Sequence, residues 1–438
     1  MTLTEAAFWT KRFGSIVIGF LGILIIILFI ALNPFKEPNI PIEYVTPNFA
    51  CTETKEEFLE NTLTIPSLEL LSGTTVSFEV QTDTGKLDDD LPDVVNVYRY
   101  TDLGQYIDSQ AQAKILAKKM GFAPEEMKRR GTTEYIFYDT NTSRSLSVNA
   151  RDLNFTFSTS VSKIREIRRN KDLPSESEAI SLATTALRTL GILPSEYISG
   201  PVVPYLIDIN PDGTYSQAGS LLEAELFRID FRRKVPMISI RTDIRGADSV
   251  VSALLRRNLT YEMGKTIINN ESVEVYNFST LLTYQNPVKS NISVYVGAEN
   301  DSLKILKNIY QIDYKVWNIE PDHCGTYPLI DPSIAKDKVE NGEGSIVFVN
   351  YDSDEVQPYT PQEISRFLVT SVNITYYEGL LEQKYLQPVY LFGGQAELKN
   401  GKWADFHIYY PAINYAIVGD KIELEETPIE EGNGLFSF

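Results

Sequence analysis

Few residues in this sequence could support metal or nucleophilic chemistry, because its 438 residues include only two histidines and two cysteines. A zinc site needs three or four ligands, and neither His323 nor His407 has a partner at the spacing of a zinc motif. His323 precedes Cys324, and consecutive residues of a strand point to opposite faces, which is poor geometry for a nucleophile and its base. His407 follows Trp403 in a strand-like segment and is typical of a packed side chain. We therefore predict no catalytic residue, no cofactor and no metal ligand.

One acidic loop imitates the start of a calcium site. Asp208, Asn210 and Asp212 alternate as in the first half of an EF-hand loop. The twelfth position holds Gly219, where a bidentate glutamate is needed. The run Asn-Pro-Asp-Gly is also a strong turn sequence, because proline fixes φ and glycine accepts positive φ. We predict a turn here.

The two cysteines, Cys51 and Cys324, lie far apart in the sequence. Outside the cytoplasm they could pair and tie an N-terminal stalk to a distant domain. The alternative is two unrelated buried thiols, and the sequence gives no distance between them.

A basic run and several tyrosines are candidate interaction residues. Residues 163–171 (KIREIRRNK) contain five cations, namely Lys163, Arg165, Arg168, Arg169 and Lys171. Such a run is usually a solvated face, and the alternative is a docking site for an acidic partner or lipid headgroups. Tyr409, Tyr410 and Tyr415 are candidates for exposed rings that contact glycan or peptide. The net charge of −19 argues against binding to nucleic acid.

An apolar segment near the N-terminus dominates the predicted organisation. Residues 14–32 (GSIVIGFLGILIIILFIAL) carry no charge and would form a helix of about 28 Å, close to the thickness of a bilayer core. Lys11 and Arg12 precede the segment, which predicts a cytoplasmic N-terminus and an extracytoplasmic bulk. A cleavable signal peptide is the alternative, but no small-x-small site follows. We predict a single-pass signal-anchor in the cell membrane.

The remaining chain predicts an α+β fold, with a single transmembrane helix followed by tandem small domains, each a helix packed on an antiparallel sheet. The predicted units are a cytoplasmic tail (1–13), the transmembrane helix (14–32), a proline-rich stalk (33–61), three α+β domains (62–172, 173–325 and 326–425) and an acidic tail (426–438).

Local signals support several elements. Two helices are expected to end alike, at Gly121 and Gly191, each followed by a proline three residues later, and the second helix is expected to be one turn longer. This offset of seventy suggests a repeat, with chance similarity of two helix ends as the alternative. Asn400-Gly401 predicts a tight hairpin, and Thr360-Pro361 predicts the start of a helix.

The third unit contains short motifs that resemble a known family. They are YPL (327–329), Ala335 and Val339, NGEG (341–344), YY (376–377) and YLQPVYLFGG (385–394). These motifs resemble the extracytoplasmic PepSY/YycI/YycH-type proteins over residues 327–425. The resemblance implies a bitopic protein with small helix-on-sheet domains. Gram-positive members of that family restrain a membrane histidine kinase, so it also implies a regulatory or scaffolding role, without transferring a catalytic residue.

These observations favour a membrane-anchored, extracytoplasmic, non-catalytic regulatory or interaction protein. Its expected partners are the lipid bilayer, through residues 14–32, and a membrane or envelope protein such as a sensor kinase. One alternative is an envelope module that binds glycan or peptide. Another is a hydrolase that uses paired carboxylates, but no pair among the 59 acidic residues can be chosen from the sequence.

Overall fold

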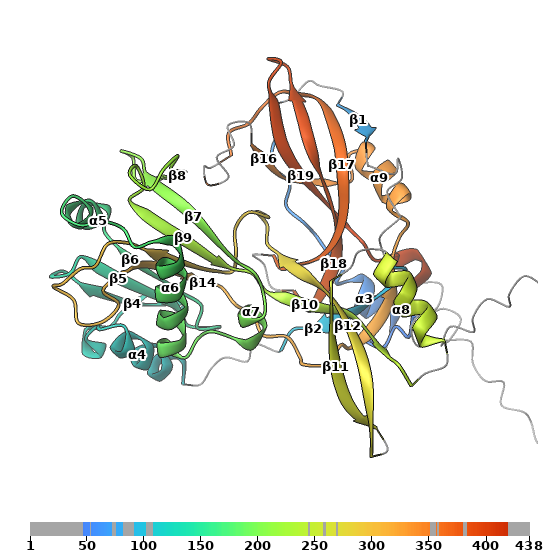
Figure 1. Cartoon of the computed structure of the whole chain (residues 1–438), viewed down its shortest axis with the longest axis horizontal. Helices are drawn as coiled ribbons and strands as arrows, with labels where there is room; N and C mark the ends of the chain where they lie inside the picture. Colours follow the sequence, from blue (N-terminus) through green and yellow to red (C-terminus); the bar gives the residue numbers. More distant parts are fainter. Residues whose placement is uncertain are drawn as a thin grey trace, which may run out of the picture.

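The computed structural model describes residues 47–418 except 53, 72–75, 82–91, 102–107, 244–245, 257–259, 269, 351–355, 357–358 and 380–382. Within these residues the chain forms two large β-sheets with helices packed against them (Figure 1). One sheet has ten strands and the other has nine. The two sheets lie side by side in Figure 1, with the nine-stranded sheet on the left.

The ten-stranded sheet is built around a long antiparallel meander. Its strands are β1 (Ser77–Val80), β2 (Val94–Arg99), β10 (Lys234–Arg241), β11 (Tyr261–Ile268), β12 (Glu271–Thr283), β15 (Gly325–Pro328), β16 (Ser345–Asn350), β17 (Ile364–Tyr377), β18 (Tyr385–Leu398) and β19 (Trp403–Pro411). The main path runs β10-β12-β17-β18-β19-β16. Strand β11 pairs with β12, and β1 runs parallel to β17. Strand β2 pairs with β15 and with the first two residues of β18.

Sequence signals explain this meander. Gly401 adopts a φ of +80° in the turn between β18 and β19, so the predicted Asn400-Gly401 hairpin is confirmed. Apolar residues on alternate positions, such as Phe367, Val369 and Phe406, enter one core. Helix α8 (Ala247–Arg256) and helix α9 (Pro332–Glu340) add further side chains to that core.

The nine-stranded sheet is antiparallel throughout, in the order β3-β4-β5-β6-β14-β13-β9-β7-β8. Its strands are β3 (Lys128–Arg130), β4 (Glu134–Asp139), β5 (Arg144–Asn149), β6 (Phe155–Thr159), β7 (Val202–Ile209), β8 (Tyr215–Gln217), β9 (Leu226–Phe231), β13 (Ile292–Val296) and β14 (Ile309–Tyr314). Helices α4 (Ser109–Lys119) and α6 (Glu176–Leu190) share one apolar core on it, and α5 (Val161–Arg168) packs into a separate core with Ile207 and Tyr295.

Helices α4 and α6 end in the same way. The N–H groups of Phe122 and Ile192 donate to Ala117 and Leu187, and those of Gly121 and Gly191 donate to Lys118 and Arg188. Each donor and acceptor is therefore repeated seventy residues later. Both glycines have positive φ, and η1 (Pro124–Glu126) and α7 (Ser195–Ile198) follow them. The predicted equivalence of the helix ends is confirmed, including the longer second helix.

The N-termini of α4 and α6 are capped differently. Ser175 and Glu178 form the predicted capping box of α6. In α4 the N-cap is Asp108, without a side-chain cap, and Ser109 shares a hydrogen bond with the Tyr135 hydroxyl. The residues of α6 that face the sheet include Ala179 and two further alanines, so the helix approaches the strands closely.

The predicted fold class is corrected by this architecture. The chain is mixed α+β and mostly sheet, but it does not consist of three tandem domains that each carry their own sheet. Strands β10–β12 and β15 belong to the same sheet as β17, whereas β13 and β14 join β6 and β9. The predicted boundaries at 172/173 and 325/326 therefore do not separate the two sheets.

The predicted transmembrane helix and signal-anchor are not supported by the described part of the chain. None of the helices in the described part of the chain is long and apolar enough to cross a membrane. The predicted span 14–32, the tail 1–13 and the acidic tail 426–438 lie outside the described residues. The described end of the predicted stalk, from residue 47 to 61, is folded onto the ten-stranded sheet, where Phe49, Cys51 and Phe58 are buried.

Candidate functional site

A disulfide bond joins Cys51 to Cys324, 273 residues apart in the sequence. Cys324 directly precedes β15, and its N–H donates to the carbonyl of Val97 on β2. The bond therefore fastens the N-terminal strap, which we define as residues 47–52, to the β2–β15 pair.

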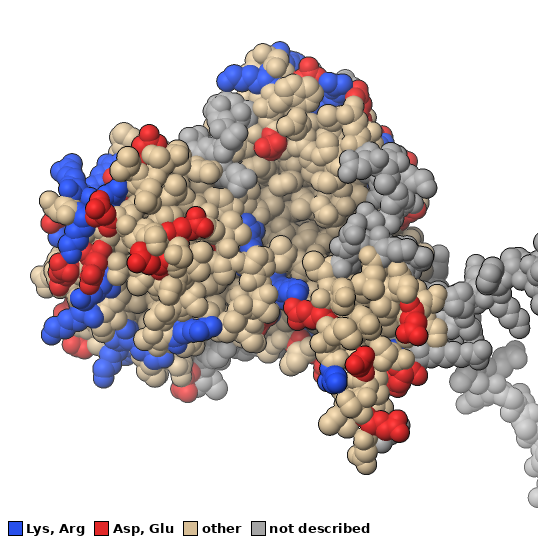
Figure 2. All heavy atoms as spheres, in the orientation of Figure 1, with Lys and Arg blue, Asp and Glu red and all other residues tan. Residues whose placement is uncertain are grey.

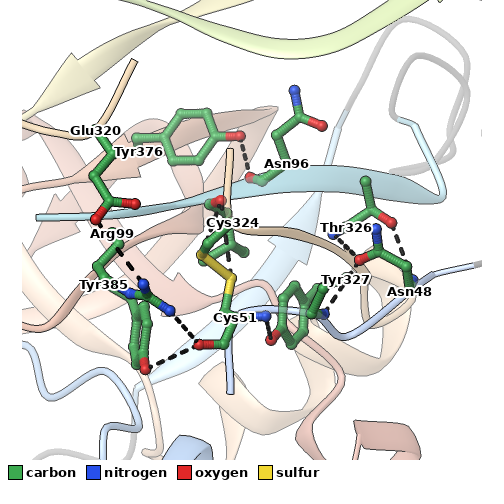
Figure 3. The surroundings of a disulfide bond; sticks show 12 residues. Asn48, Cys51, Asn96, Arg99, Glu320, Cys324, Thr326, Tyr327, Tyr376 and Tyr385 are labelled. Carbon is green, nitrogen blue, oxygen red and sulfur yellow. Dashed lines mark hydrogen bonds and ion pairs between the residues drawn. A yellow bond between two sulfur atoms is a disulfide. The ribbon is translucent and has the colours of Figure 1, made fainter. Parts of the chain in front are cut away.

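The strap is also held by hydrogen bonds, which Figure 3 shows around the two sulfurs. The Arg99 guanidinium donates to the Cys51 carbonyl at 2.8 Å, and the Cys51 N–H donates to the Tyr327 hydroxyl at 3.2 Å. Asn48 and Thr326 exchange two hydrogen bonds through their side chains, at 2.8 and 3.1 Å.

Close packing at the disulfide sets the residue types around it. A side chain at Gly325 would place its Cβ 2.7 Å from the backbone nitrogen of Ala50, so the strap can cross only over glycine. Helix α3 (Lys55–Leu59) follows the strap, and its Phe58 ring stacks on Tyr327 with centroids 4.5 Å apart. This pair therefore anchors α3 beside the disulfide.

The basic run of residues 163–171 lies in and after α5 and is mostly engaged with the protein itself. Arg165 forms an ion pair with Glu225 at 3.0 Å, and Arg168 donates to the Ala224 carbonyl at 3.0 Å. Figure 2 shows basic and acidic side chains interspersed at this end of the molecule.

The other members of the run differ in exposure. Lys163 pairs with Glu166 at 2.9 Å, and Lys171 pairs with Asp301. Arg169 is exposed and has no partner among the described residues. The structure thus gives this run a structural role in holding α5 to the β7–β9 region.

The predicted tyrosine surface is not formed. Tyr409 is fully buried, and its hydroxyl donates to the Tyr284 carbonyl at 3.1 Å. Tyr410 and Tyr415 are half-buried, and the Tyr415 hydroxyl donates to Gln387 at 2.7 Å. The expectation that these rings are exposed to glycan is therefore wrong for Tyr409. The three tyrosines do not form one exposed surface.

The histidines occupy separate places. His323 lies beside Cys324, whose sulfur is bonded to Cys51. His407 stacks on Phe348 at 5.4 Å between ring centroids. Burial lowers the pKa of both imidazoles below the ordinary value.

Within the described residues, no three His, Cys, Asp or Glu side chains gather where a metal ion could bind. The acidic loop of residues 208–213 forms the predicted turn between β7 and β8.

Sequence reasoning missed a buried polar junction between the sheets. The chain passes from one sheet to the other four times, after β2, β9, β12 and β14. Arg233 lies in the second passage, where it donates to the Trp317 carbonyl of the fourth passage at 2.9 Å and to Glu196 at 2.9 Å. Its side chain is almost completely buried.

Glu378 follows β17 and occupies the same junction, with only 1% of its surface exposed. Its N–H donates to the Thr283 carbonyl at 3.0 Å, and its carboxylate accepts a hydrogen bond from the Asn291 side chain. Arg233 and Tyr100 also face it. Groups from three of the four passages therefore meet around this carboxylate, and Arg233 links them to the fourth through the Trp317 carbonyl. We call Glu378, Arg233, Asn291, Tyr100 and Glu196 the junction cluster.

Burial controls the ionisation of Glu378. Removal from water raises its pKa to about 7 from an ordinary value of 4.5, although the Arg233 guanidinium and the Tyr100 hydroxyl lower it. Between these two pH values the folded protein holds a proton that the unfolded chain releases. The resulting stabilisation is complete below pH 4.5 and declines toward pH 7, by about 3 kcal/mol.

A second feature missed in the sequence is a projecting hairpin formed by β11 and β12 (Figure 1, lower edge). Strand β11 pairs only with β12 in the described part of the chain, so its outer edge is open. Met263 and Ile267 point to one face of β11 and are 55% and 78% exposed. The sequence of β11 places apolar and polar residues on both faces, and it does not reveal which edge stays unpaired.

A groove of about 790 Å³ lies over one face of this hairpin and extends from β11 across β12 to β10. One side is formed by β11, through Gly264, Thr266 and Ile268, and the other by the strap, through Pro47 and Asn48. Its walls also contain polar side chains that can bind a peptide backbone, namely Asn96, Ser239, Asn277 and Thr326. The disulfide holds the strap in place and so positions one wall of this groove.

We predict that loss of the disulfide lowers stability substantially. Replacing both Cys51 and Cys324 by serine should lower the free energy of unfolding by about 3–5 kcal/mol, because the bond closes a long loop in the unfolded chain. Urea unfolding with and without a thiol reductant measures the effect. The reductant should destabilise the wild type and leave the double variant unchanged, and an unchanged wild type would contradict this prediction.

We also predict that Glu378→Gln changes the pH dependence of stability. The variant cannot release a proton, so its free energy of unfolding relative to the wild type should rise from pH 5 to pH 8, by about 3 kcal/mol. Urea unfolding at intervals of one pH unit provides the comparison. Glu299→Gln, at an exposed carboxylate paired with Lys307, is the control and should run parallel to the wild type. Parallel curves for Glu378→Gln would refute the assignment.

Comparisons with known proteins give one structural neighbour and no family. No protein family model and no curated protein matches the sequence. The chain is similar to the crystal structure of an uncharacterized protein from Eubacterium rectale, with 12% identity and a TM-score of 0.35. The match covers 80% of this chain and 92% of that protein.

Proposed function

We propose that this protein is a non-catalytic, extracytoplasmic interaction protein that binds an extended polypeptide segment of an envelope partner along β11. The observation that carries this proposal is the groove over one face of β11, a strand whose outer edge is open. An incoming strand can pair with such an edge through its backbone, while alternate side chains enter the groove and set specificity.

The chemistry of the groove supports a peptide partner. Asn277 borders the groove, and its Nδ2 can donate to a carbonyl group of a peptide while its Oδ1 accepts from Ser239. Ile238, Val275 and Ile268 add apolar surface for side chains of the partner. The exposed Met263 and Ile267 lie on the opposite face of β11 and give it a second apolar surface.

The disulfide supports the proposed compartment. Disulfides that hold structure persist in oxidising compartments and are rare in the cytosol. The Cys51–Cys324 bond lies within the fold rather than at a reactive surface, because Cys51 is buried. A regulatory role like that implied by the PepSY-type resemblance is compatible with peptide binding and remains part of this proposal.

We predict that a photo-crosslinking amino acid at position 267 captures one partner protein in cells. A probe at Leu222, which is 90% exposed on the nine-stranded sheet side, is the matched control and should not capture it. A second substitution, Ile268→Asp, should abolish capture at position 267 because it places a charge in the groove.

The outcome is read by identification of the crosslinked product. A product that forms equally at both positions, or that survives Ile268→Asp, would contradict recognition along β11. Capture at Leu222 alone would move the interface to the nine-stranded sheet.

A further inference from the structure

Glycine occupies an interior position of β11, at residue 264. A glycine inside a strand weakens it, because glycine loses more conformational freedom on folding than other residues and has no side chain to pack on the sheet. A strand glycine is explained by an unusual backbone conformation, by a close contact within the fold, or by the close approach of a binding partner.

Neither the backbone nor the packing of the fold requires glycine at this position. The φ angle of Gly264 lies outside the left-handed region. A Cβ atom there would lie 3.2 Å from Nδ2 of Asn277, at the end of a side chain, and 3.9 Å from the Val275 carbonyl oxygen. At Gly325 and Gly394, by contrast, a Cβ atom would fall within 2.7 Å of a backbone atom. The approach of a partner is the remaining explanation for Gly264.

The position of Gly264 suits such an approach. It borders the groove and belongs to the strand whose outer edge is open in the described part of the chain. On its inner side Gly264 is paired with Val275 of β12, so a strand added along β11 would lie on its other side. The residue of that strand directly opposite Gly264 would place its side chain on the groove face. Because Gly264 has no side chain, that group could cross β11 toward Val275.

The surface along this path suits a flat aromatic ring. Val275 and Ile268 supply apolar side chains to the groove. The bare peptide groups of a glycine near a sheet edge are stabilised when an aromatic side chain of the neighbouring strand covers them. A ring in this place would bury both the peptide groups of Gly264 and the apolar surface behind them.

Charged side chains suit the path less well. Among the described residues that line the groove none is Asp or Glu, so a cationic side chain would meet no counter-charge. Arg241 is already paired with Asp243 at 2.7 Å, and Lys265 follows Gly264 and therefore begins on the other face of β11. An acidic side chain would give up hydration while its nearest guanidinium already has a carboxylate partner.

We propose that Gly264 marks a specificity subsite that receives an aromatic side chain of the partner segment, an inference that rests on the proposed pairing of this segment along β11. The ring lies over the peptide groups of Gly264 and reaches Val275. The partner is therefore restricted to extended segments that carry Phe, Tyr or Trp at the position opposite Gly264.

Selection from a displayed library of random peptides, on the full-length protein, tests the proposal. Peptides that bind the wild type but not Ile268→Asp depend on the groove. They should share Phe, Tyr or Trp at one position, in preference to Leu, Ile or Val, and replacing that residue by alanine should weaken binding by about tenfold or more. Groove-dependent peptides without such a position would overturn the subsite and leave the proposed function standing. If no selected peptide depends on the groove, both are overturned.

Variants of Gly264 test the subsite from the protein side. Gly264→Ala and Gly264→Val should weaken the binding of the selected peptides progressively, because each added carbon fills the path across β11. Gly264→Ala should not lower the melting temperature, since glycine is the poorer strand former and the fold does not require it. Unchanged binding in both variants, or a lower melting temperature in Gly264→Ala, would contradict the proposal.

Gly219→Ala is the matched control. Its Cβ would also meet the end of a side chain, Oε2 of Glu223 at 3.1 Å, but it lies between β8 and β9 of the nine-stranded sheet. This variant should bind the selected peptides as the wild type does. An equal loss of binding in Gly219→Ala and Gly264→Ala would show a general effect of the substitution and overturn the assignment.

A double-mutant cycle separates the subsite from a general effect on the strand. A selected peptide whose aromatic residue is replaced by alanine no longer fills the subsite, so Gly264→Val should weaken its binding much less than that of the parent peptide. Equal losses for the two peptides would show that position 264 acts without the ring, and would refute the subsite.

Discussion

Buried polar groups around Arg233 and Glu378 link the segments on which the arrangement of the two sheets depends. Burying either charge alone would be costly, and each is compensated by groups from other passages of the chain. Arg233 donates hydrogen bonds to the Trp317 carbonyl and to Glu196, and Glu378 accepts a hydrogen bond from the Asn291 side chain. Because these groups come from segments far apart in sequence, the junction can form only when both sheets are in place.

This dependence explains why the molecule is not a chain of separate modules. Each sheet is assembled from distant segments, since β10–β12 interrupt the strands of the nine-stranded sheet and β13–β14 interrupt those of the ten-stranded sheet. A second buried pair, Arg228 and Asp230, lies within β9 at 3.1 Å, and Ser293 of β13 donates to Asp230 at 2.6 Å. Buried polar contacts thus fix strand neighbours that apolar packing alone would leave interchangeable.

Local signals in the sequence predicted local structure well. The Asn400-Gly401 turn, the Ser175 capping box and the two glycine helix ends all depend on a few adjacent residues, and all are present. The helix predicted from Thr360-Pro361 is absent, because the segment instead lies extended beside residues 69–71. There, tertiary hydrogen bonds outweigh the local preference for a helix.

The candidate sites could not be predicted from adjacent residues. The run at 163–171 reads as a charged surface, but its side chains reach carbonyl groups of residues near 209 and 224. Glu378 gives no signal in the sequence, because its burial and its raised pKa depend on segments near 100, 233 and 291. The groove beside β11 likewise requires the strap, whose place is set by a bond across 273 residues.

The redox state of the two cysteines in living cells reports directly on the proposed compartment and on the bond that holds the strap. Cells are quenched with acid and the protein is alkylated before and after reduction, so that each thiol is counted by mass. For an extracytoplasmic interaction protein whose groove depends on the strap, Cys51 and Cys324 should react only after reduction. Two thiols that react without reduction would place the protein in a reducing compartment and contradict the proposed function.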